Sequence, residues 1–173
     1  LPFSLGWSLR TDELQGIVHV DADRCEVTVL GGTYVSTVNE ALAAHDPPLG
    51  MCNLGSISNQ TVAGVISTAT HGTGLHFPVL SANVLALTLV CPLASGTALV
   101  RCSRTERPEL FNATLCGLGA TGIIVLVTMQ VERAFCLKQV TEDVPSDVLL
   151  GPPAPPGEPT DLLAAQPLSL IHI

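Results

Sequence analysis

Residues 53–74 read Asn53-Leu-Gly-Ser-Ile-Ser-Asn-Gln-Thr-Val-Ala-Gly-Val-Ile-Ser-Thr-Ala-Thr-His-Gly-Thr-Gly74, and this segment constrains fold and function more than any other. It combines glycine and small hydroxylated residues with one short apolar run. Glycine lets a backbone approach a ligand with no Cβ in between, and consecutive free N–H groups form a concavity that suits an anion. We therefore expect a flat, phosphate-bearing cofactor to lie against this segment.

A short helix is expected inside this segment, over residues 60–67, with Ser58 or Asn59 as its N-cap. The positive end of its dipole would then point at the same cofactor. Residues 70–72 would add a compact polar wall beside it.

The remaining hydrophobic pattern predicts an α+β lobe. Alternating or continuous β-branched runs predict strands, and amphipathic runs predict helices. Their order predicts an antiparallel or mixed sheet with helices packed on one face. The expected strands are 16–20, 25–30, 84–91, 98–102 and 123–131, and the expected helices are 34–45 and one that starts at Pro108, with Leu110, Phe111 and Leu115 buried.

The character of the chain changes after about Val140. Residues 144–167 are rich in Pro, Asp and Glu and have no periodicity, which is typical of disordered or linker segments. The last six residues, Leu168-Ser-Leu-Ile-His-Ile173, match the translation of one frame of a common sequencing adapter. We expect a domain over 1–140 and a Pro-rich disordered tail over 141–173 that arises from truncation or read-through; a genuine disordered C-terminus is the alternative.

Residues 53–74 closely resemble the flavin-embracing loop of the vanillyl-alcohol-oxidase-like FAD enzymes, which have a PCMH-type FAD-binding domain. Within that family they are most similar to the sugar-1,4-lactone oxidases, the D-arabinono- and L-gulono-1,4-lactone oxidases. The resemblance runs from about Gly6 to about Phe135. Its most specific pieces are Gly55-Ser-Ile-Ser58 and Thr61-Val-Ala-Gly-Val-Ile-Ser-Thr-Ala-Thr-His-Gly-Thr-Gly74, supported by Val27-Thr-Val-Leu-Gly-Gly32, Arg101-Cys-Ser-Arg104, Pro108-Glu-Leu-Phe111 and Gly117-Leu-Gly-Ala-Thr-Gly-Ile-Ile124.

The resemblance implies that residues 1–140 are the second lobe of a PCMH-type FAD-binding domain, without the N-terminal lobe and the C-terminal substrate cap. Such enzymes transfer a hydride from a sugar lactone to FAD and reduce oxygen to hydrogen peroxide in ascorbate or erythroascorbate biosynthesis. The fragment is expected to be inactive alone, because the catalytic acid and base belong to the cap. A mitochondrial or organelle-membrane location follows from the resemblance only, and the lactone is not specified.

The resemblance also assigns a cofactor wall for FAD. From the residues alone, the hydroxyls could be ordinary capping groups, and His71 could simply hydrogen-bond nearby backbone. The resemblance gives His71 a positioning or electrostatic role instead. The expected wall is Gly55, Ser56, Ile57, Ser58, Gln60, Gly64, Thr70, His71, Gly72 and Ile124.

Residues 117–122 match the dinucleotide-binding pattern G-x-G-x-x-G letter for letter. That pattern requires a strand before it and a helix after it. Here the predicted helix comes first and the strand second, so a Rossmann site is rejected. A tight turn is the simpler interpretation, and the resemblance places its end at Ile124 beside the cofactor.

Composition excludes several classes of function. Seven basic against fifteen acidic residues give a net charge of −8, which argues against nucleic-acid partners. The hydrophobic content of 47% with only 13% charged residues predicts a lobe that buries surface against another part of its protein. No Cys-x-x-Cys pair occurs, so we expect the six cysteines to be small buried hydrophobes rather than disulfides or metal ligands.

No apolar run reaches the length of a membrane-spanning helix, so any membrane contact would involve regions outside this chain. Two rival functions remain at this stage. One is a non-catalytic binding module that retains the lobe. The other is a hydrolase that uses Ser56 and His71.

Overall fold

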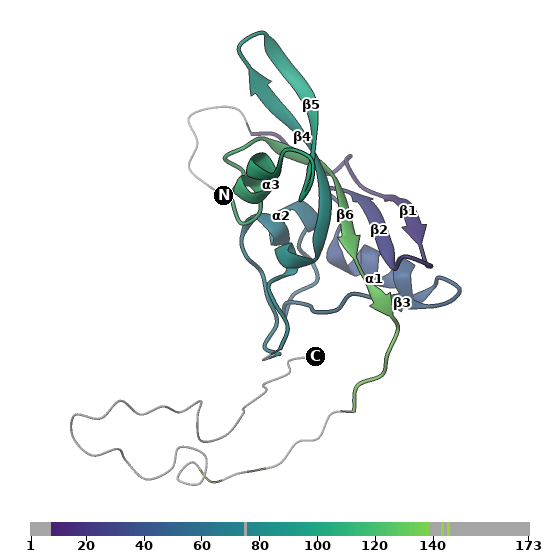
Figure 1. The fold of residues 1–173 in the computed structure, drawn as a ribbon. Helices are drawn as coiled ribbons and strands as arrows, with labels where there is room; N and C mark the ends of the chain where they lie inside the picture. Colours follow the sequence, from purple (N-terminus) through teal and green to yellow (C-terminus); the bar gives the residue numbers. More distant parts are fainter. Residues whose placement is uncertain (1–7, 75, 139–142, 144, 146–173) are drawn as a thin grey trace, which may run out of the picture.

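The computed structural model describes residues 8–74, 76–138, 143 and 145, so the predicted 141–173 tail lies almost wholly outside the described residues. Its centre is a five-stranded sheet in the order β1-β2-β6-β4-β5 (Figure 1). Every neighbouring pair is antiparallel, which resolves the alternative between a mixed and an antiparallel sheet. The strands are β1 Ile17–Asp21, β2 Glu26–Leu30, β4 Val84–Leu93, β5 Gly96–Ser103 and β6 Ile123–Gln130.

Three α-helices and a 3₁₀ turn connect these strands, and the sequence predicts all three α-helices. Pro108 opens its helix at the first turn, where its missing N–H costs nothing. The sequence did not predict the 3₁₀ turn or a second, two-stranded sheet. The elements are α1 Val35–Ala43, α2 Val62–Ser67, α3 Pro108–Thr114, η1 Leu80–Asn83, and the paired strands β3 Leu49–Gly50 and β7 Glu132–Arg133.

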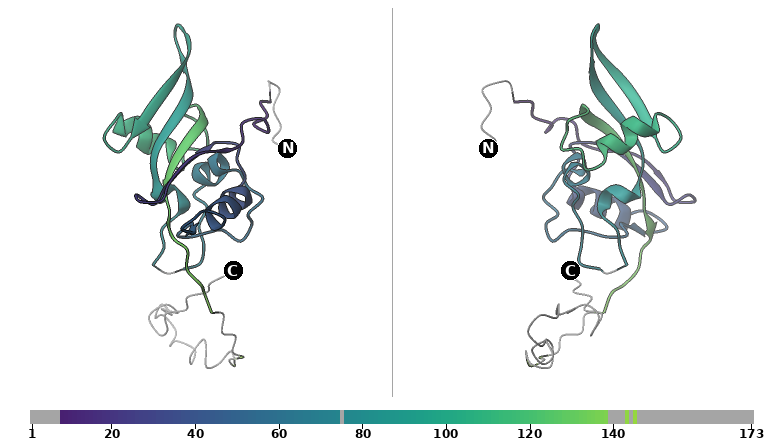
Figure 2. Two further views of the ribbon diagram at one scale, coloured as in Figure 1. Left: turned by 90° about the vertical axis from the view of Figure 1, so that its right-hand side faces the viewer. Right: turned by 60° about the vertical axis from the view of Figure 1, so that its left-hand side comes forward.

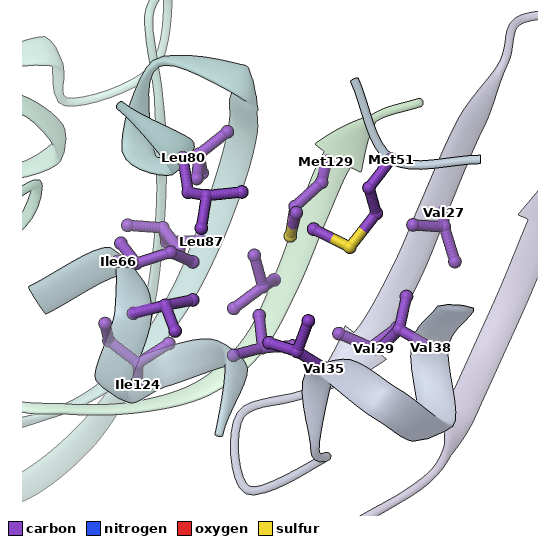
Figure 3. Packing of buried hydrophobic residues seen from close by; sticks show 14 of the residues in the cluster. Val27, Val29, Val35, Val38, Met51, Ile66, Leu80, Leu87, Ile124 and Met129 are labelled. Atoms are coloured by element: carbon purple, nitrogen blue, oxygen red, sulfur yellow. The ribbon is translucent and has the colours of Figure 1, made fainter. Parts of the chain in front are cut away.

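One face of the large sheet and the helices share a single hydrophobic core (Figure 3). On β2 only alternate residues, Val27 and Val29, are fully buried, because successive side chains of a strand point to opposite faces. Helix α1 adds Val35 and Val38 to the same cluster. Of the three apolar residues predicted to be buried with α3, only Phe111 is fully buried; Leu110 is half-buried, and so is Leu115, which directly follows the helix. The helices therefore pack on one face, as predicted.

Strands β4 and β5 form a long hairpin that projects well beyond the rest of the molecule (Figures 1 and 2). Its base contributes Leu87, Leu89 and Cys102 to the core. Its outer part is solvent-exposed, including the large side chains Leu93 and Leu99. The base of this hairpin thus belongs to the core, whereas beyond Val90 the two strands pair only with each other.

All six cysteines are free thiols, but they do not share one environment. Cys91 and Cys102 are buried as predicted, whereas Cys116 and Cys136 are exposed, so the prediction of burial is wrong for those two. Burial is the main cause that raises the pKa of the Cys52 and Cys102 thiols, which keeps both protonated near neutral pH. No described helix is long and apolar enough to cross a membrane.

Candidate cofactor-binding site

Helix α2 organises the segment 53–74. It begins one residue after Thr61, whose side-chain oxygen accepts a hydrogen bond from the Gly64 N–H at 3.2 Å. The N-cap is therefore Thr61, and the prediction of Ser58 or Asn59 is wrong. Thr61 directly precedes the buried residues Val62, Val65 and Ile66, and a cap adjoins the first residue of the apolar period.

The N-terminus of α2 does not offer its donors to a ligand. The Val62 N–H donates to the Thr33 carbonyl at 2.8 Å, and the Ala63 N–H donates to the Gly31 carbonyl at 2.9 Å. Together with the Gly64 bond to Thr61, these contacts use the first three N–H groups of the helix. The expectation that this helix end points its dipole at a cofactor is therefore wrong, because the protein itself occupies that end.

The C-terminus of α2 turns sharply through Ala69, whose φ of 55° is in the left-handed region. The Thr70 N–H returns to the Val65 carbonyl at 3.1 Å, which is the six-to-one bond of a Schellman motif. Glycine usually occupies this position, because a Cβ is strained there. The turn places Thr68, Ala69 and Thr70 at the protein surface.

The Gly117–Gly122 turn lies against this same end of α2. The Cys116 N–H donates to the Ile66 carbonyl at 3.1 Å, and the Leu118 N–H donates to the Ser67 carbonyl at 3.2 Å. The turn follows α3 and precedes β6, the reverse of a dinucleotide-binding motif. Two segments far apart in sequence therefore meet at the end of α2, directly beside Thr68.

Asn53 and two glycines hold the arms of the segment together. The Asn53 Nδ2 donates to the Pro78 carbonyl at 3.2 Å. A Cβ on Gly72 would lie 2.2 Å from Asn53 Oδ1 and 2.6 Å from the Leu54 carbonyl oxygen, so only glycine fits there. A Cβ on Gly55 would lie 2.9 Å from the Thr70 Cγ2. At Gly72 the two arms therefore approach each other too closely for a residue with a Cβ, and at Gly55 the Thr70 side chain would have to move.

A cleft of about 340 Å³ opens between these arms. This volume is near the lower end of the range for small-molecule sites, roughly 300–1,000 Å³, so it suits part of a flavin nucleotide rather than the whole molecule. The lining fits such a group, because it joins close-approaching backbone and small polar side chains with Ile57, which is 62% exposed. The lining residues are Gly55, Ser56, Ile57, Gln60, Thr68, Ala69, Thr70 and His71.

The hydroxyls of the segment fall into two groups. Thr61 caps the helix, the Ser67 hydroxyl donates to the Ala63 carbonyl at 2.8 Å, and the Thr68 and Thr70 hydroxyls lie 3.2 Å apart. Within the part of the chain that the structure describes, the hydroxyls of Ser56 and Ser58 have no hydrogen-bond partner. Of these two, Ser56 lines the cleft. The capping interpretation therefore holds for several hydroxyls, while Ser56 is available to a ligand.

His71 lies at the edge of the cleft with a fixed ring orientation. Its Nδ1 is 2.7 Å from the Gly72 carbonyl oxygen. A carbonyl only accepts, so Nδ1 carries the proton and donates. In the neutral ring Nε2 is then an acceptor directed elsewhere. Ser56 and His71 share no hydrogen bond among the described contacts, so the pair lacks the nucleophile–base contact of a hydrolase.

Six of the ten predicted wall residues line the cleft, and the other four do not. Ser58 is exposed, and its carbonyl accepts the Ser36 N–H at 3.1 Å. Contacts within the protein account for Gly64, whose N–H binds the Thr61 side chain, and for Gly72, which packs against Asn53 and Leu54. Ile124 is 5% exposed and its side chain belongs to the core, so the predicted contact of its backbone with the cofactor stays a prediction.

The sequence reasoning missed Thr68 and Ala69, which also line the cleft. A hydroxyl-rich stretch directly after a short apolar helix is a signal that would have included them. In the described ranges 8–74 and 76–138, no three His, Cys, Asp or Glu side chains are grouped so as to hold a metal ion.

Comparisons with known proteins agree on one family. The family model described as "FAD binding domain" matches residues 3–102. D-arabinono-1,4-lactone oxidase of Yarrowia lipolytica is 36% identical over 148 residues, which cover 83% of this chain and 27% of that protein. L-gulonolactone oxidase of Bos taurus is 35% identical over 136 residues, 79% of this chain and 30% of that protein.

A plant relative and a solved structure extend the comparison. The mitochondrial L-galactono-1,4-lactone dehydrogenase 1 of Oryza sativa is 40% identical over 118 residues, 68% of this chain and 19% of that protein. Cholesterol oxidase from B. sterolicum superposes with a TM-score of 0.69 at 26% identity, over 80% of this chain and 27% of that chain. The chain thus spans less than a third of the length of each of these proteins.

Proposed function

This chain belongs to the FAD binding domain family, and from that premise we propose that its cleft holds part of FAD in a sugar-1,4-lactone oxidase. The observation that carries the proposal is the cleft itself, where a Cβ on Gly55 would lie 2.9 Å from the Thr70 Cγ2 and Ser56 keeps a free hydroxyl. The named activities of the lactone oxidase relatives support the choice of substrate class.

Each side chain of the cleft has a role that follows from its chemistry. The Ser56 hydroxyl and the Gln60 amide donate hydrogen bonds to phosphate or ribityl oxygens. Ile57 supplies apolar contact to a flat ring, and His71 accepts a hydrogen bond through Nε2. The flavin, when bound, supplies the hydride acceptor for the hydroxyl-bearing carbon of the lactone and passes the electrons to oxygen, which becomes hydrogen peroxide.

We expect the 173-residue chain alone to bind FAD weakly and to oxidise nothing. A cleft of about 340 Å³ covers only part of a dinucleotide, so much of the ligand stays in water. We assign no catalytic acid or base to this chain. The cofactor-binding proposal rests on the residues that line the cleft. They are the six predicted residues Gly55, Ser56, Ile57, Gln60, Thr70 and His71, together with Thr68 and Ala69.

The partners of the parent enzyme are proposed from the same family. They are FAD and a sugar lactone, and the excess of acidic over basic residues argues against nucleic acid. A mitochondrial location is supported by the name of the rice relative. Fractionation of cells that express the parent protein checks it; recovery outside mitochondria and organelle membranes would reject it.

A chimera tests the proposed function. Residues 8–138 replace the matching region of the Yarrowia lactone oxidase, and the purified chimera is assayed for bound FAD and for lactone-dependent peroxide. We expect both. The matched variant Gly55→Val places a branched side chain against Thr70 and should lose FAD, while Gly50→Ala, with no neighbouring atom closer than 4.0 Å, should keep it.

The outcomes separate the two remaining functions. FAD retention with D-arabinono- or L-gulono-1,4-lactone oxidation supports the oxidase. FAD retention without peroxide supports a binding module that keeps only the lobe. A folded chimera without FAD, as judged by its circular dichroism and absorbance spectra, contradicts the proposal.

A further inference from the structure

The outer edge of β5 is the most exposed backbone of the large sheet. Strand β5 is the last in the order β1-β2-β6-β4-β5, so one edge of β5 pairs with β4 and its other edge faces outward. Along a strand, consecutive residues direct their N–H and C=O groups to alternate edges. An unpaired edge is a template for another strand, and proteins usually protect it.

The part of this edge at residues 101–103 is protected by the loop that follows β5. The Arg107 Nη1 donates to the Arg101 carbonyl at 2.9 Å, and the Ser103 N–H donates to the Glu106 carbonyl at 2.7 Å. These two contacts also reveal that residues 101 and 103 direct their backbone groups outward. By alternation, Thr97 and Leu99 do the same, and among the described residues nothing pairs with them.

The part of the edge at residues 97–99 also lacks the charges that normally prevent pairing. Residues 80–100 contain no Asp, Glu, Lys, Arg or His, although the chain has a net charge of −8. The Leu99 side chain is 71% exposed there. Residues 8–138 carry ten acidic and seven basic side chains, and the outer part of this projecting hairpin carries neither, so two copies can approach each other there without charge repulsion.

We propose that β5 pairs antiparallel with β5 of a second copy of this chain, about a twofold axis at Ala98. In this register Thr97 of each copy faces Leu99 of the other, and all four outward N–H and C=O groups of each copy find partners. A register centred on Leu99 would bring Thr97 opposite Arg101, whose carbonyl Arg107 already occupies. The twofold pairing closes on itself, so it yields dimers and not filaments.

Sedimentation velocity on the full chain tests this pairing. This pairing consists of only four hydrogen bonds, so we expect a monomer–dimer equilibrium with a dissociation constant on the order of 100 µM, measured between about 5 and about 500 µM. Leu99→Lys should raise that constant at least about tenfold, because a charge is introduced at the pairing edge. The matched control Leu93→Lys adds the same charge to the same hairpin, away from the β5 edge, and should change it less than about twofold.

Cross-linking supplies an independent readout of the register. Ala98→Cys should give a disulfide-linked dimer on oxidation, since the two Cα atoms of this pair on the axis lie about 4.5 Å apart. Ser95→Cys lies away from the axis and should not exceed the unsubstituted chain. A monomer throughout the concentration range, equal weakening by both lysine variants, or larger oligomers would overturn the proposal.

Discussion

At the N-terminus of helix α2 the backbone N–H groups donate to other parts of the protein. In the cleft that begins at the C-terminus of α2, by contrast, polar groups are available to a ligand. The first three N–H groups of the helix bind Thr33, Gly31 and Thr61. In the cleft, Ser56 and the Nε2 of His71 have no partner among the described residues. The two ends belong to one hydroxyl-rich segment, so residue type alone does not identify a ligand-binding group.

Gly72→Ala should have the largest effect, because it attacks the closure between the two arms. The new Cβ meets Asn53 Oδ1 and the Leu54 carbonyl, and the backbone must separate. We expect a loss of about 2 kcal/mol in the free energy of unfolding, measured by urea denaturation. Gly50→Ala is the control and should stay within about 0.5 kcal/mol. Equal losses from both variants would mean that the arms are not closed by Gly72.

Thr61→Ala removes the cap at the closed end of α2. The Gly64 N–H loses its acceptor, and the unfolding free energy should fall by about 1 kcal/mol. Thr61→Ser keeps the oxygen and should retain most of the stability. Weak FAD binding, measured by NMR, should be unchanged in Thr61→Ser, since the proposal places the cofactor at the other end of α2. A fall in affinity without a change in stability would reverse the assignment of the two ends.

Ala69→Gly should stabilise the chain by about 1 kcal/mol, because glycine adopts the left-handed turn without strain. The same substitution within the helix, Ala63→Gly, should destabilise by a comparable amount. Thermal unfolding of the two variants gives the opposite signs directly. If both substitutions destabilise, Ala69 does not occupy a strained C-terminal turn.

Ser56→Ala should leave stability within about 0.5 kcal/mol, because the hydroxyl has no partner in the protein. It should nevertheless weaken FAD binding by about tenfold if that hydroxyl donates to a phosphate. Ser67→Ala is the matched control, since its hydroxyl already binds the Ala63 carbonyl. Unchanged FAD binding by Ser56→Ala would remove this residue from the proposed wall.

The sequence predicts the regular elements well because local patterns determine them. Alternation marks β2, and Pro108 marks the start of α3. The sequence does not predict the pairing of Leu49–Gly50 with Glu132–Arg133, because two residues carry no periodicity and the contact is distant in sequence. It also does not give the strand order, which places β6 between β2 and β4.

The candidate site is predictable in its location and less so in its details. The glycine-rich segment does form the cleft, but Ile124 is a core residue and Gly64 serves the helix cap. A turn through Ala69 could not be expected, because alanine rarely adopts a positive φ. Which hydroxyls remain free depends on the helix register, and a shift of the cap from Ser58 to Thr61 reassigns them.

Titration of the ¹⁵N-labelled chain with FAD, followed by amide chemical shifts, tests the central claim most directly. The account predicts weak, fast-exchange binding with shifts concentrated in residues 55–57, 60 and 68–71, and little change at Val62 and Ala63. Shifts at the N-terminus of α2 or on the β4–β5 hairpin, with none in the cleft, would contradict it.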